Sequence, residues 1–346
     1  MSDEGGRTRT PPRAILFGCA GERLSGEERR LFAEADPLGF VLFRRNCSEP
    51  AQLRALVAEL RGCVGRVDAP VLIDQEGGRV ARLRPPHWRS YPAAARLAAL
   101  PDGEAEEAVR LGARLIADDL TSLGITVDAA PVLDLPVAGA DAVIGDRAYG
   151  GGPDRVARLG RAMCEGLLAG GVLPIIKHIP GHGRARVDSH HACPVVDADA
   201  AELAVTDFAP FRLLADMAWA MTAHVVYSAF DREPATLSRR VIDQVIRGQI
   251  GFDGVLVSDD LGMGALSGRL GERVGNALHA GCDLALHCSG VLGEMADLVE
   301  TAPPVSAETG ARLARGEAMR LAARRAFDRA EAEARFGVLT GAVAAR

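Results

Sequence analysis

Residues 172–178 read Val172-Leu173-Pro174-Ile175-Ile176-Lys177-His178, an apolar run that stops abruptly at two polar residues. An apolar run without polar alternation is typical of a strand that is buried on both faces, as in a parallel sheet. Similar short runs recur along the chain and predict eight strands, at Ala14–Phe17, Phe40–Phe43, Val71–Ile73, Ile125–Ala129, Val172–Ile176, Trp219–Ala223, Val255–Val257 and Asp283–Leu286.

Amphipathic helical patterns separate these strands. The clearest lie at Pro50–Val64, Glu104–Leu123, Asp154–Ala169, Asp199–Leu214, Arg239–Gln249 and Val291–Thr301, and a long closing helix is predicted over Ser306–Arg335. Strands that alternate with helices predict right-handed βαβ units, and eight such units fit an α/β fold of the (β/α)8 TIM-type barrel. We expect one domain over residues 1–346, with a core over about 14–335 and no second domain.

A doubly wound open sheet is the competing prediction. It would require a Gly-x-Gly-x-x-Gly turn after the first strand, and Phe17-Gly18-Cys19-Ala20-Gly21 does not supply one. The barrel is therefore favoured.

The composition excludes several classes of protein. The chain has 40 Lys+Arg against 46 Asp+Glu, a formal net charge of −6, and 48% hydrophobic residues. The apolar content predicts a globular protein, and the acidic balance argues against nucleic-acid binding, which needs a basic face. No run approaches the ~18 apolar residues of a membrane helix, and the polar start lacks a signal-peptide pattern. We expect a cytoplasmic protein without a membrane partner, whose oligomeric state the sequence does not indicate.

The cysteines and glycines point to no cofactor. The seven cysteines are scattered, and none forms a Cys-x-x-Cys pair, so we expect neither a disulfide framework nor a thiolate zinc site. No Gly-x-x-x-x-Gly-Lys-Ser/Thr run occurs, which leaves a nucleotide-phosphate loop unsupported.

Polar residues stand where the apolar runs stop. One aspartate after a strand is equally well a cap or turn residue. Many strands ending this way in a barrel would direct their side chains to one face, where barrel active sites lie. The sequence therefore predicts a shared polar pocket, formed by Asp74, Asp128, Asp134, Lys177, His178, His224, Asp259, Asp260 and His287.

Four of the eight histidines fall within His178–His191. Histidine titrates near neutral pH, and an aspartate two residues before His190 can orient its ring, so a proton-transfer site is predicted. The alternative is a metal site, because His178 and His182 have i, i+4 spacing. Pro180 and Gly181 break the helix which that geometry requires.

Two further features admit two interpretations. Of the adjacent Asp259 and Asp260, one can face the barrel mouth as a nucleophile or base while the other caps a helix beginning near Leu261. Arg147, in a glycine-bounded loop, suits recognition of hydroxyl or carboxylate groups, and a loop salt bridge is the equal alternative.

Four strings together resemble one family: Asp74-Gln75-Glu76-Gly77-Gly78-Arg79-Val80, Lys177-His178-Ile179-Pro180-Gly181-His182-Gly183, Asp188-Ser189-His190 and Ser258-Asp259-Asp260-Leu261-Gly262-Met263. They are similar to the bacterial β-N-acetylglucosaminidases (β-hexosaminidases) of glycoside hydrolase family 3, of the single-domain type that works in peptidoglycan recycling. The likeness runs from about Ala14 to Gly290.

The resemblance implies a retaining exo-β-N-acetylglucosaminidase that acts through a covalent glycosyl-enzyme. Its substrate would be N-acetylglucosaminyl-anhydro-N-acetylmuramic acid and the peptide-bearing forms. Asp259 matches the nucleophile, and His190, paired with Asp188 on a mobile loop, matches the general acid/base. The positions that match those holding the terminal sugar are Asp74, Arg82, Arg147, Lys177 and His178.

The chain departs from the family pattern beside that loop. Ile179 replaces a more usual phenylalanine, no Asp-Thr follows Gly183, and Cys193 stands where an aliphatic residue is common. The alternatives are a metal-dependent hydrolase that uses the His178–His191 cluster with Asp259, and a β-glucosidase or phosphorylase of the same family. A sugar-binding protein without activity would require a broken catalytic set, and here the set is intact.

Overall fold

The computed structural model describes residues 10–341, in which all eight predicted strands pair side by side in a closed parallel barrel. Neighbouring strands follow chain order, and the last pairs with the first. The strands are β1 (Arg13–Gly18), β2 (Pro37–Leu42), β3 (Val71–Ile73), β6 (Val127–Asp128), β7 (Leu173–Ile179), β9 (Trp219–Thr222), β11 (Val255–Asp260) and β12 (Leu284–His287). The predicted barrel is confirmed, and β7 and β11 include polar residues that were expected just beyond them.

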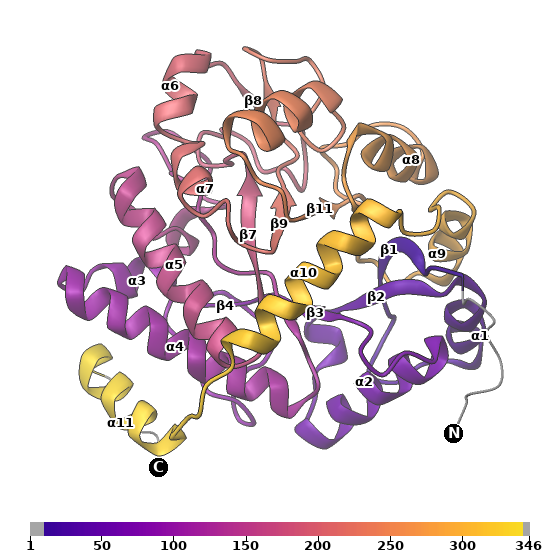
Figure 1. Cartoon of the computed structure of the whole chain (residues 1–346), viewed down its shortest axis with the longest axis horizontal. Helices are drawn as coiled ribbons and strands as arrows, with labels where there is room; N and C mark the ends of the chain where they lie inside the picture. Colours follow the sequence, from indigo (N-terminus) through magenta and orange to yellow (C-terminus); the bar gives the residue numbers. More distant parts are fainter. Residues whose placement is uncertain (1–9, 342–346) are drawn as a thin grey trace.

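Helices surround the barrel (Figure 1). They are α1 (Gly26–Ala35), η1 (Arg44–Asn46), α2 (Pro50–Val64), α3 (Ala94–Ala98), α4 (Asp102–Ser122), η2 (Gly145–Arg147), α5 (Pro153–Ala169), α6 (Ala200–Val205), α7 (Ala209–Leu213), the π-helical η3 (Val241–Gln249), α8 (Leu270–Ala280), α9 (Leu292–Val299), α10 (Ala307–Ala323) and α11 (Arg329–Thr340). Two small sheets lie outside the barrel, an antiparallel hairpin of β4 (Gln75–Gly77) with β5 (Val80–Ala81), and β8 (Val195–Val196) beside β10 (Val226–Tyr227).

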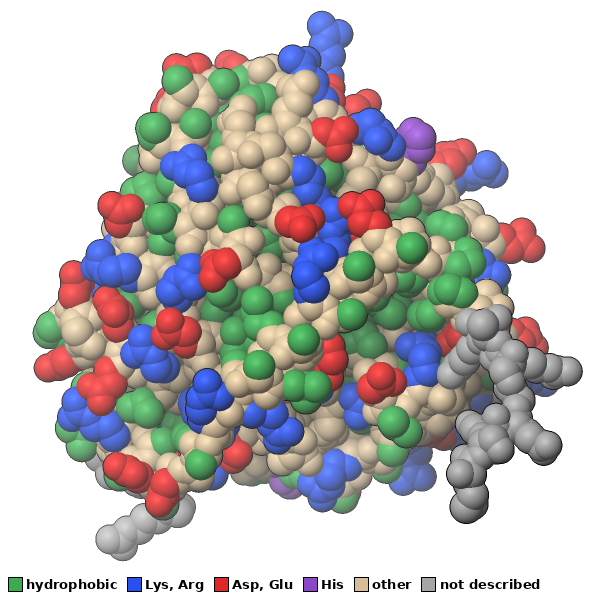
Figure 2. Space-filling view, in the orientation of Figure 1, with side chains coloured by type: hydrophobic (Ala, Val, Ile, Leu, Met, Phe, Trp, Pro, Cys, Tyr) green, Lys and Arg blue, Asp and Glu red, His purple; other side chains and the backbone are tan. Residues whose placement is uncertain are grey.

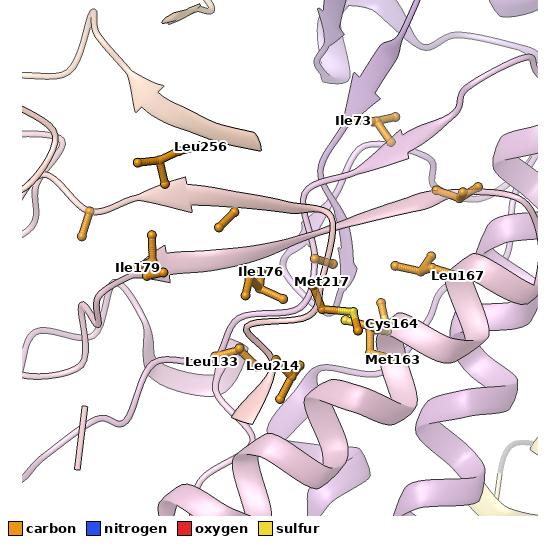
Figure 3. Close-up of a cluster of buried hydrophobic side chains, with 14 of the residues drawn as sticks. Ile73, Leu133, Met163, Cys164, Leu167, Ile176, Ile179, Leu214, Met217 and Leu256 are labelled. Carbon is orange, nitrogen blue, oxygen red and sulfur yellow. The ribbon is translucent and has the colours of Figure 1, made fainter. Parts of the chain in front are cut away.

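Alternating residues of each strand supply two separate cores, because successive side chains point to opposite faces. In β7, Leu173 and Ile175 fill the barrel interior, whereas Ile176 packs outward in the larger core beneath the helices. Figure 3 shows part of this outer core, where Met163, Cys164 and Leu167 of α5 project toward the strands.

Helix α10 crosses the N-terminal ends of the strands (Figure 1). Its Gly316 packs on the indole of Trp219 at the start of β9, and Arg320 donates a hydrogen bond to Gly171 O before β7. On this face, basic and acidic side chains are interspersed around α10 (Figure 2). Helix α10 thus covers part of the N-terminal end of the barrel, where a cavity of about 530 Å³ remains beside it.

Two predicted helices are each broken in two. The helix predicted over Asp199–Leu214 is α6 and α7, because the buried Asp207 between them pairs with Arg184 at 2.6 Å and Pro210 starts α7. The closing helix is α10 and α11, since Asp328 caps a new helix by accepting a hydrogen bond from Glu331 N.

The helix predicted to begin near Leu261 is also wrong. Helix α8 begins at Leu270, and Asp260 stabilises a turn instead, accepting hydrogen bonds from Gly262 N at 3.0 Å and Cys288 N at 3.2 Å. Within residues 10–341, no helix combines the length and the apolar character needed to span a bilayer.

Gly166 of α5 packs closely against the backbone of α4. A Cβ added to Gly166 would stand 2.4 Å from Arg110 O, so Gly166→Ala should force the helices apart and lower the free energy of unfolding by about 1–3 kcal/mol. Gly275→Ala in α8, where a Cβ meets no atom within 4 Å, should stabilise by up to ~1 kcal/mol. Urea midpoints at unchanged slope measure both effects, and equal midpoints would contradict this packing constraint.

Candidate active site

A pocket of about 730 Å³ opens at the C-terminal ends of the barrel strands. The side-chain alternation that fills the barrel also builds its wall: Asp74 follows the inward Leu72, Lys177 follows Ile175, and Asp259 follows Val257, each two residues on. The lining includes all eight predicted catalytic and sugar-binding residues, namely Asp74, Arg82, Arg147, Lys177, His178, Asp188, His190 and Asp259. The nine strand-end residues predicted to share a polar pocket divide into two groups. Five line it, namely Asp74, Lys177, His178, Asp259 and Asp260, whereas four are buried and are not among the lining residues, namely Asp128, Asp134, His224 and His287.

Five charged side chains of alternating sign run along one side of the pocket. Arg82 binds Asp74 at 2.9 Å, and Asp74 binds Lys177 Nζ at 2.8 Å. Lys177 Nζ lies 2.6 Å from Glu76, whose carboxylate also binds Arg147 through two hydrogen bonds of 2.8 and 2.9 Å. This ion chain joins the end of β3, the β4–β5 hairpin, β7 and η2.

The ion chain keeps the buried Lys177 and the partly buried Asp74 charged. Burial alone would raise the pKa of Asp74, yet the Lys177 ammonium and the Arg82 guanidinium hold it well below its ordinary value. Burial would likewise lower the pKa of Lys177, and Asp74 and Glu76 raise it instead. Of the two alternatives predicted for Arg147, the salt bridge is present, formed with Glu76, and the side chain also lines the pocket.

Hydrogen bonds of Gln75 and Asp128 hold the β4–β5 hairpin in place beside the ion chain. The buried Gln75 side chain accepts hydrogen bonds from Arg82 N and Leu83 N, at 2.9 and 3.0 Å. Gln75 N in turn donates to Asp128 Oδ1 at 2.9 Å, while Asp128 Oδ2 is buried without a hydrogen-bond partner. Burial raises the pKa of Asp128 to about 7.

Asp134 orients two histidines from behind. Its Oδ2 lies 2.7 Å from His178 Nδ1, and its Oδ1 accepts from His182 N at 2.7 Å. A carboxylate can only accept here, so His178 carries its proton on Nδ1 and presents Nε2 to the pocket. Burial would raise the pKa of Asp134, but His178 lowers it to about 2.

Asp259 stands at the mouth as an ionised carboxylate. Burial would raise its pKa, and His224 and His178 outweigh that effect and lower it. Asp260 N donates to its Oδ1 at 2.8 Å, and no lysine or arginine among residues 10–341 forms a salt bridge with it. Asp259 is thus charged while one oxygen remains available for attack.

His190 and Asp188 form a dyad on the segment between β7 and β8. His190 Nδ1 lies 2.7 Å from Asp188 Oδ1, which fixes the ring and leaves Nε2 for a substrate. The His190 side chain is 59% exposed and lines the same pocket as Asp259. An ionised carboxylate and an oriented imidazole on one pocket can divide nucleophilic attack and proton transfer between them.

The clustered histidines do not converge on one point. His178 is engaged by Asp134, His182 by Ser189, and His191 is not among the pocket residues. Among residues 10–341, no three His, Cys, Asp or Glu side chains are grouped so that they could hold a metal ion. The donor set needed for the predicted metal alternative is therefore not assembled.

Glu76 is the member of the ion chain that the sequence did not predict. Its side chain is only 7% exposed and contacts two of the predicted sugar-binding cations. The signal was present, because Asp74 and Glu76 stand two residues apart in an extended segment and so share a face.

The chain matches proteins of known type over most of its length. Residues 17–314 match the glycosyl hydrolase family 3 N-terminal domain. A β-hexosaminidase of Alkalilimnicola ehrlichii is 40% identical over 282 residues, which cover 80% of each chain.

Solved structures show the same architecture. The crystal structure of NagZ from Neisseria gonorrhoeae in complex with N-trifluoroacetyl-D-glucosamine superposes with a TM-score of 0.84 at 34% identity, over 96% of this chain and 99% of that one. A family 3 β-N-acetylglucosaminidase from Paenibacillus sp. str. FPU-7 gives 0.83 at 32% identity, over 94% of this chain and 67% of that one.

Asp128→Asn tests the buried carboxyl beneath the hairpin. The pKa of Asp128 in the folded protein, about 7, lies above its ordinary value of 3.8, so its contribution to stability falls as pH rises between these values and then levels off. Asparagine keeps the acceptor for Gln75 N without titrating. The unfolding free energy of Asp128→Asn minus that of the wild type should therefore rise by on the order of 1 kcal/mol per pH unit from about pH 4 to 7. Urea titrations across this range measure the difference, with the exposed Asp243→Asn as control, and a flat difference for Asp128→Asn would refute it.

Proposed function

This chain belongs to glycoside hydrolase family 3 as a β-N-acetylhexosaminidase, and we propose that it is a retaining exo-β-N-acetylglucosaminidase. Its substrate would be N-acetylglucosaminyl-anhydro-N-acetylmuramic acid, with or without peptide, as released in peptidoglycan recycling. The observation that carries this proposal is the pairing of His190 with Asp188 on the pocket that holds the ionised Asp259.

In the first step, an Asp259 oxygen forms a bond to the anomeric carbon as the glycosidic bond breaks. His190, protonated on both nitrogens, gives its Nε2 proton to the leaving oxygen, and the aglycone departs as an alcohol. In the second step, His190 Nε2 takes a proton from water. The water oxygen attacks the anomeric carbon, the bond to Asp259 breaks, and two inversions give net retention.

The dyad suits this double role. Asp188 accepts from Nδ1 in both steps and stabilises the imidazolium that exists before the first step and again after the second. A histidine acid/base also avoids placing a second negative charge beside Asp259, which would raise the pKa of the nucleophile.

The ion chain would bind the terminal sugar. Asp74 and Glu76 hold the donors Arg82, Lys177 and Arg147 in fixed positions, and charged donors form the stronger hydrogen bonds to hydroxyl and amide oxygens. His178 would contribute its Nε2 as a further hydrogen-bonding atom for the sugar. Because this set closes one side of a pocket rather than flanking an open groove, only a terminal sugar would fit.

A cytoplasmic location is part of the proposal. All seven cysteines are free, and five are buried thiols, which fits a reducing compartment. The proposed substrate carries carbohydrate and peptide only, so no nucleic-acid or membrane partner is required.

The first experiment compares an aryl β-N-acetylglucosaminide with the matching β-glucoside, with and without chelator and inorganic phosphate. We expect cleavage of the N-acetylated substrate alone, unaffected by chelator and giving N-acetylglucosamine rather than its 1-phosphate. Preference for the glucoside would support the β-glucosidase. Formation of the 1-phosphate would support the phosphorylase, and inactivation by chelator would support the metal-dependent hydrolase.

Asp259→Ala should lower kcat by at least about 10³-fold with the fold retained, because the covalent intermediate then lacks its nucleophile. Circular dichroism and urea midpoints establish folding, and Asp260→Asn provides a neighbouring carboxylate control. Activity of Asp259→Ala near that of the wild type would remove Asp259 from the nucleophile role.

His190→Ala should lower kcat/KM for substrates with poor leaving groups by about 10²–10⁴-fold. Activated aryl glycosides should lose far less in kcat/KM, since their leaving groups need no proton. A series of leaving groups of increasing pKa measures this, and equal losses across the series would contradict the acid assignment.

A further inference from the structure

The acid/base His190 does not belong to the barrel wall. It lies in the catalytic loop, defined here as residues 184–193, which connects β7 to β8. Its side chain is 59% exposed, so packing alone does not fix it. Whatever holds the backbone of this loop therefore decides where the proton donor stands.

Two strand ends reach the catalytic loop beside His190. From the β7 side, His182 Nε2 lies 3.0 Å from Ser189 Oγ. From the β11 side, Gly264 N donates to His190 O at 3.1 Å and Ala265 N donates to Ser189 O at 3.0 Å. These three hydrogen bonds fall on the acid/base and on the residue before it.

Gly264 is a glycine for a steric reason. A Cβ at this position would stand 2.7 Å from His190 O and 3.1 Å from His191 O. Both neighbours are backbone atoms that cannot rotate away, so a side chain at 264 would push the catalytic loop off the β11 side. The close approach needs a residue without a Cβ.

His182 is a rigid support. It is buried, its backbone N–H is held by Asp134 at 2.7 Å, and its ring stacks edge-on with His178 at 5.7 Å. Burial lowers its pKa to about 4, so its ring is neutral at neutral pH. Nδ1 is buried without a partner, and the tautomer with its proton on Nε2 avoids an unpaired N–H by donating to Ser189 Oγ.

We propose that His182, Ser189 and Gly264 form a latch that holds the catalytic loop over the pocket. The three are positioning residues, since they act on the glycosidic bond only through His190. The inference rests on the proposed function of His190, and it goes beyond that function by assigning the loop's placement to particular contacts.

Substitutions in the latch should therefore lower kcat/KM with the same dependence on the leaving group as substitution of His190. If Ser189→Ala or Gly264→Ala releases the catalytic loop, protonation of the leaving oxygen suffers and attack by Asp259 does not. A defect in general stability would lower kcat/KM on every substrate alike. The dependence on leaving group separates these two effects.

The experiment measures kcat/KM for a 4-nitrophenyl and an alkyl β-N-acetylglucosaminide with Ser189→Ala, Gly264→Ala and His190→Ala. Ser228→Ala, whose exposed hydroxyl binds Asp197, and Gly293→Ala, where a Cβ meets no atom within 4 Å, are the matched controls. We expect both latch variants to lose about tenfold or more on the alkyl glycoside and less than about threefold on the aryl one. Both controls should match the wild type.

Hydrogen exchange provides a second readout that does not depend on catalysis. The amides of Gly264 and Ala265 donate the latch hydrogen bonds, so they should exchange faster in Ser189→Ala, and those of residues 184–193 faster in both latch variants. Urea midpoints show whether each variant is folded.

The outcomes separate the latch from the proposed function. Equal losses on both substrates, or wild-type exchange and kinetics in both latch variants, would overturn the latch while His190→Ala still shows its leaving-group dependence. A His190→Ala variant without that dependence would overturn the proposed function, and unchanged exchange would then overturn the latch independently.

Discussion

The burial of Lys177 is the constraint on which the site depends. Its side chain is 2% exposed, and a lone ammonium so buried would lose its charge. Asp74 and Glu76 prevent this by binding Nζ from two positions of one hairpin. The same two carboxylates bind Arg82 and Arg147, so the charge that stabilises one lysine also ties the hairpin and η2 to β7. The side of the pocket proposed to bind the sugar is in this sense one electrostatic unit.

Asp259 forms no salt bridge with the ion chain among residues 10–341, as its proposed role as nucleophile requires. A nucleophilic carboxylate must be ionised, yet a close salt bridge would hold the oxygen that has to attack. Here the lowered pKa derives first from the imidazoles of His224 and His178. Neither contacts the Asp259 carboxylate through a hydrogen bond in residues 10–341, so the charge is stabilised through the field of the site.

Local sequence patterns predicted the strands and the polar end of the barrel, but they did not predict which distant segments contact one another. The eight strands follow from apolar runs, and the alternation along them places Asp74, Lys177 and Asp259 on one face, so the barrel and its polar mouth were predictable. Glu76 could not be assigned as the partner of Arg147, because 71 residues separate them and only the closed barrel brings them together. The close packing of Gly264 could not be predicted either, because it depends on the backbone of His190 and His191, which is distant in the sequence. The break before α11 was predictable, since Asp328 and Glu331 have the spacing of an N-terminal cap.

In the proposed mechanism the nucleophile stands on a strand end and the acid/base on a loop, and their different tasks account for this division. Asp259 returns to the same ionised state after each turnover and meets one invariant atom, the anomeric carbon, so a rigid strand end suits it. His190 must gain and lose a proton in every cycle and must follow the leaving oxygen of variable aglycones, which requires access to water. A side chain that is exposed to solvent has few packing contacts, so packing does not hold it in one exact position. Gly264 N and Ala265 N donate hydrogen bonds to the backbone of His190 and Ser189, and the His190 side chain stays 59% exposed, so the proposed latch can position the loop without burying the ring.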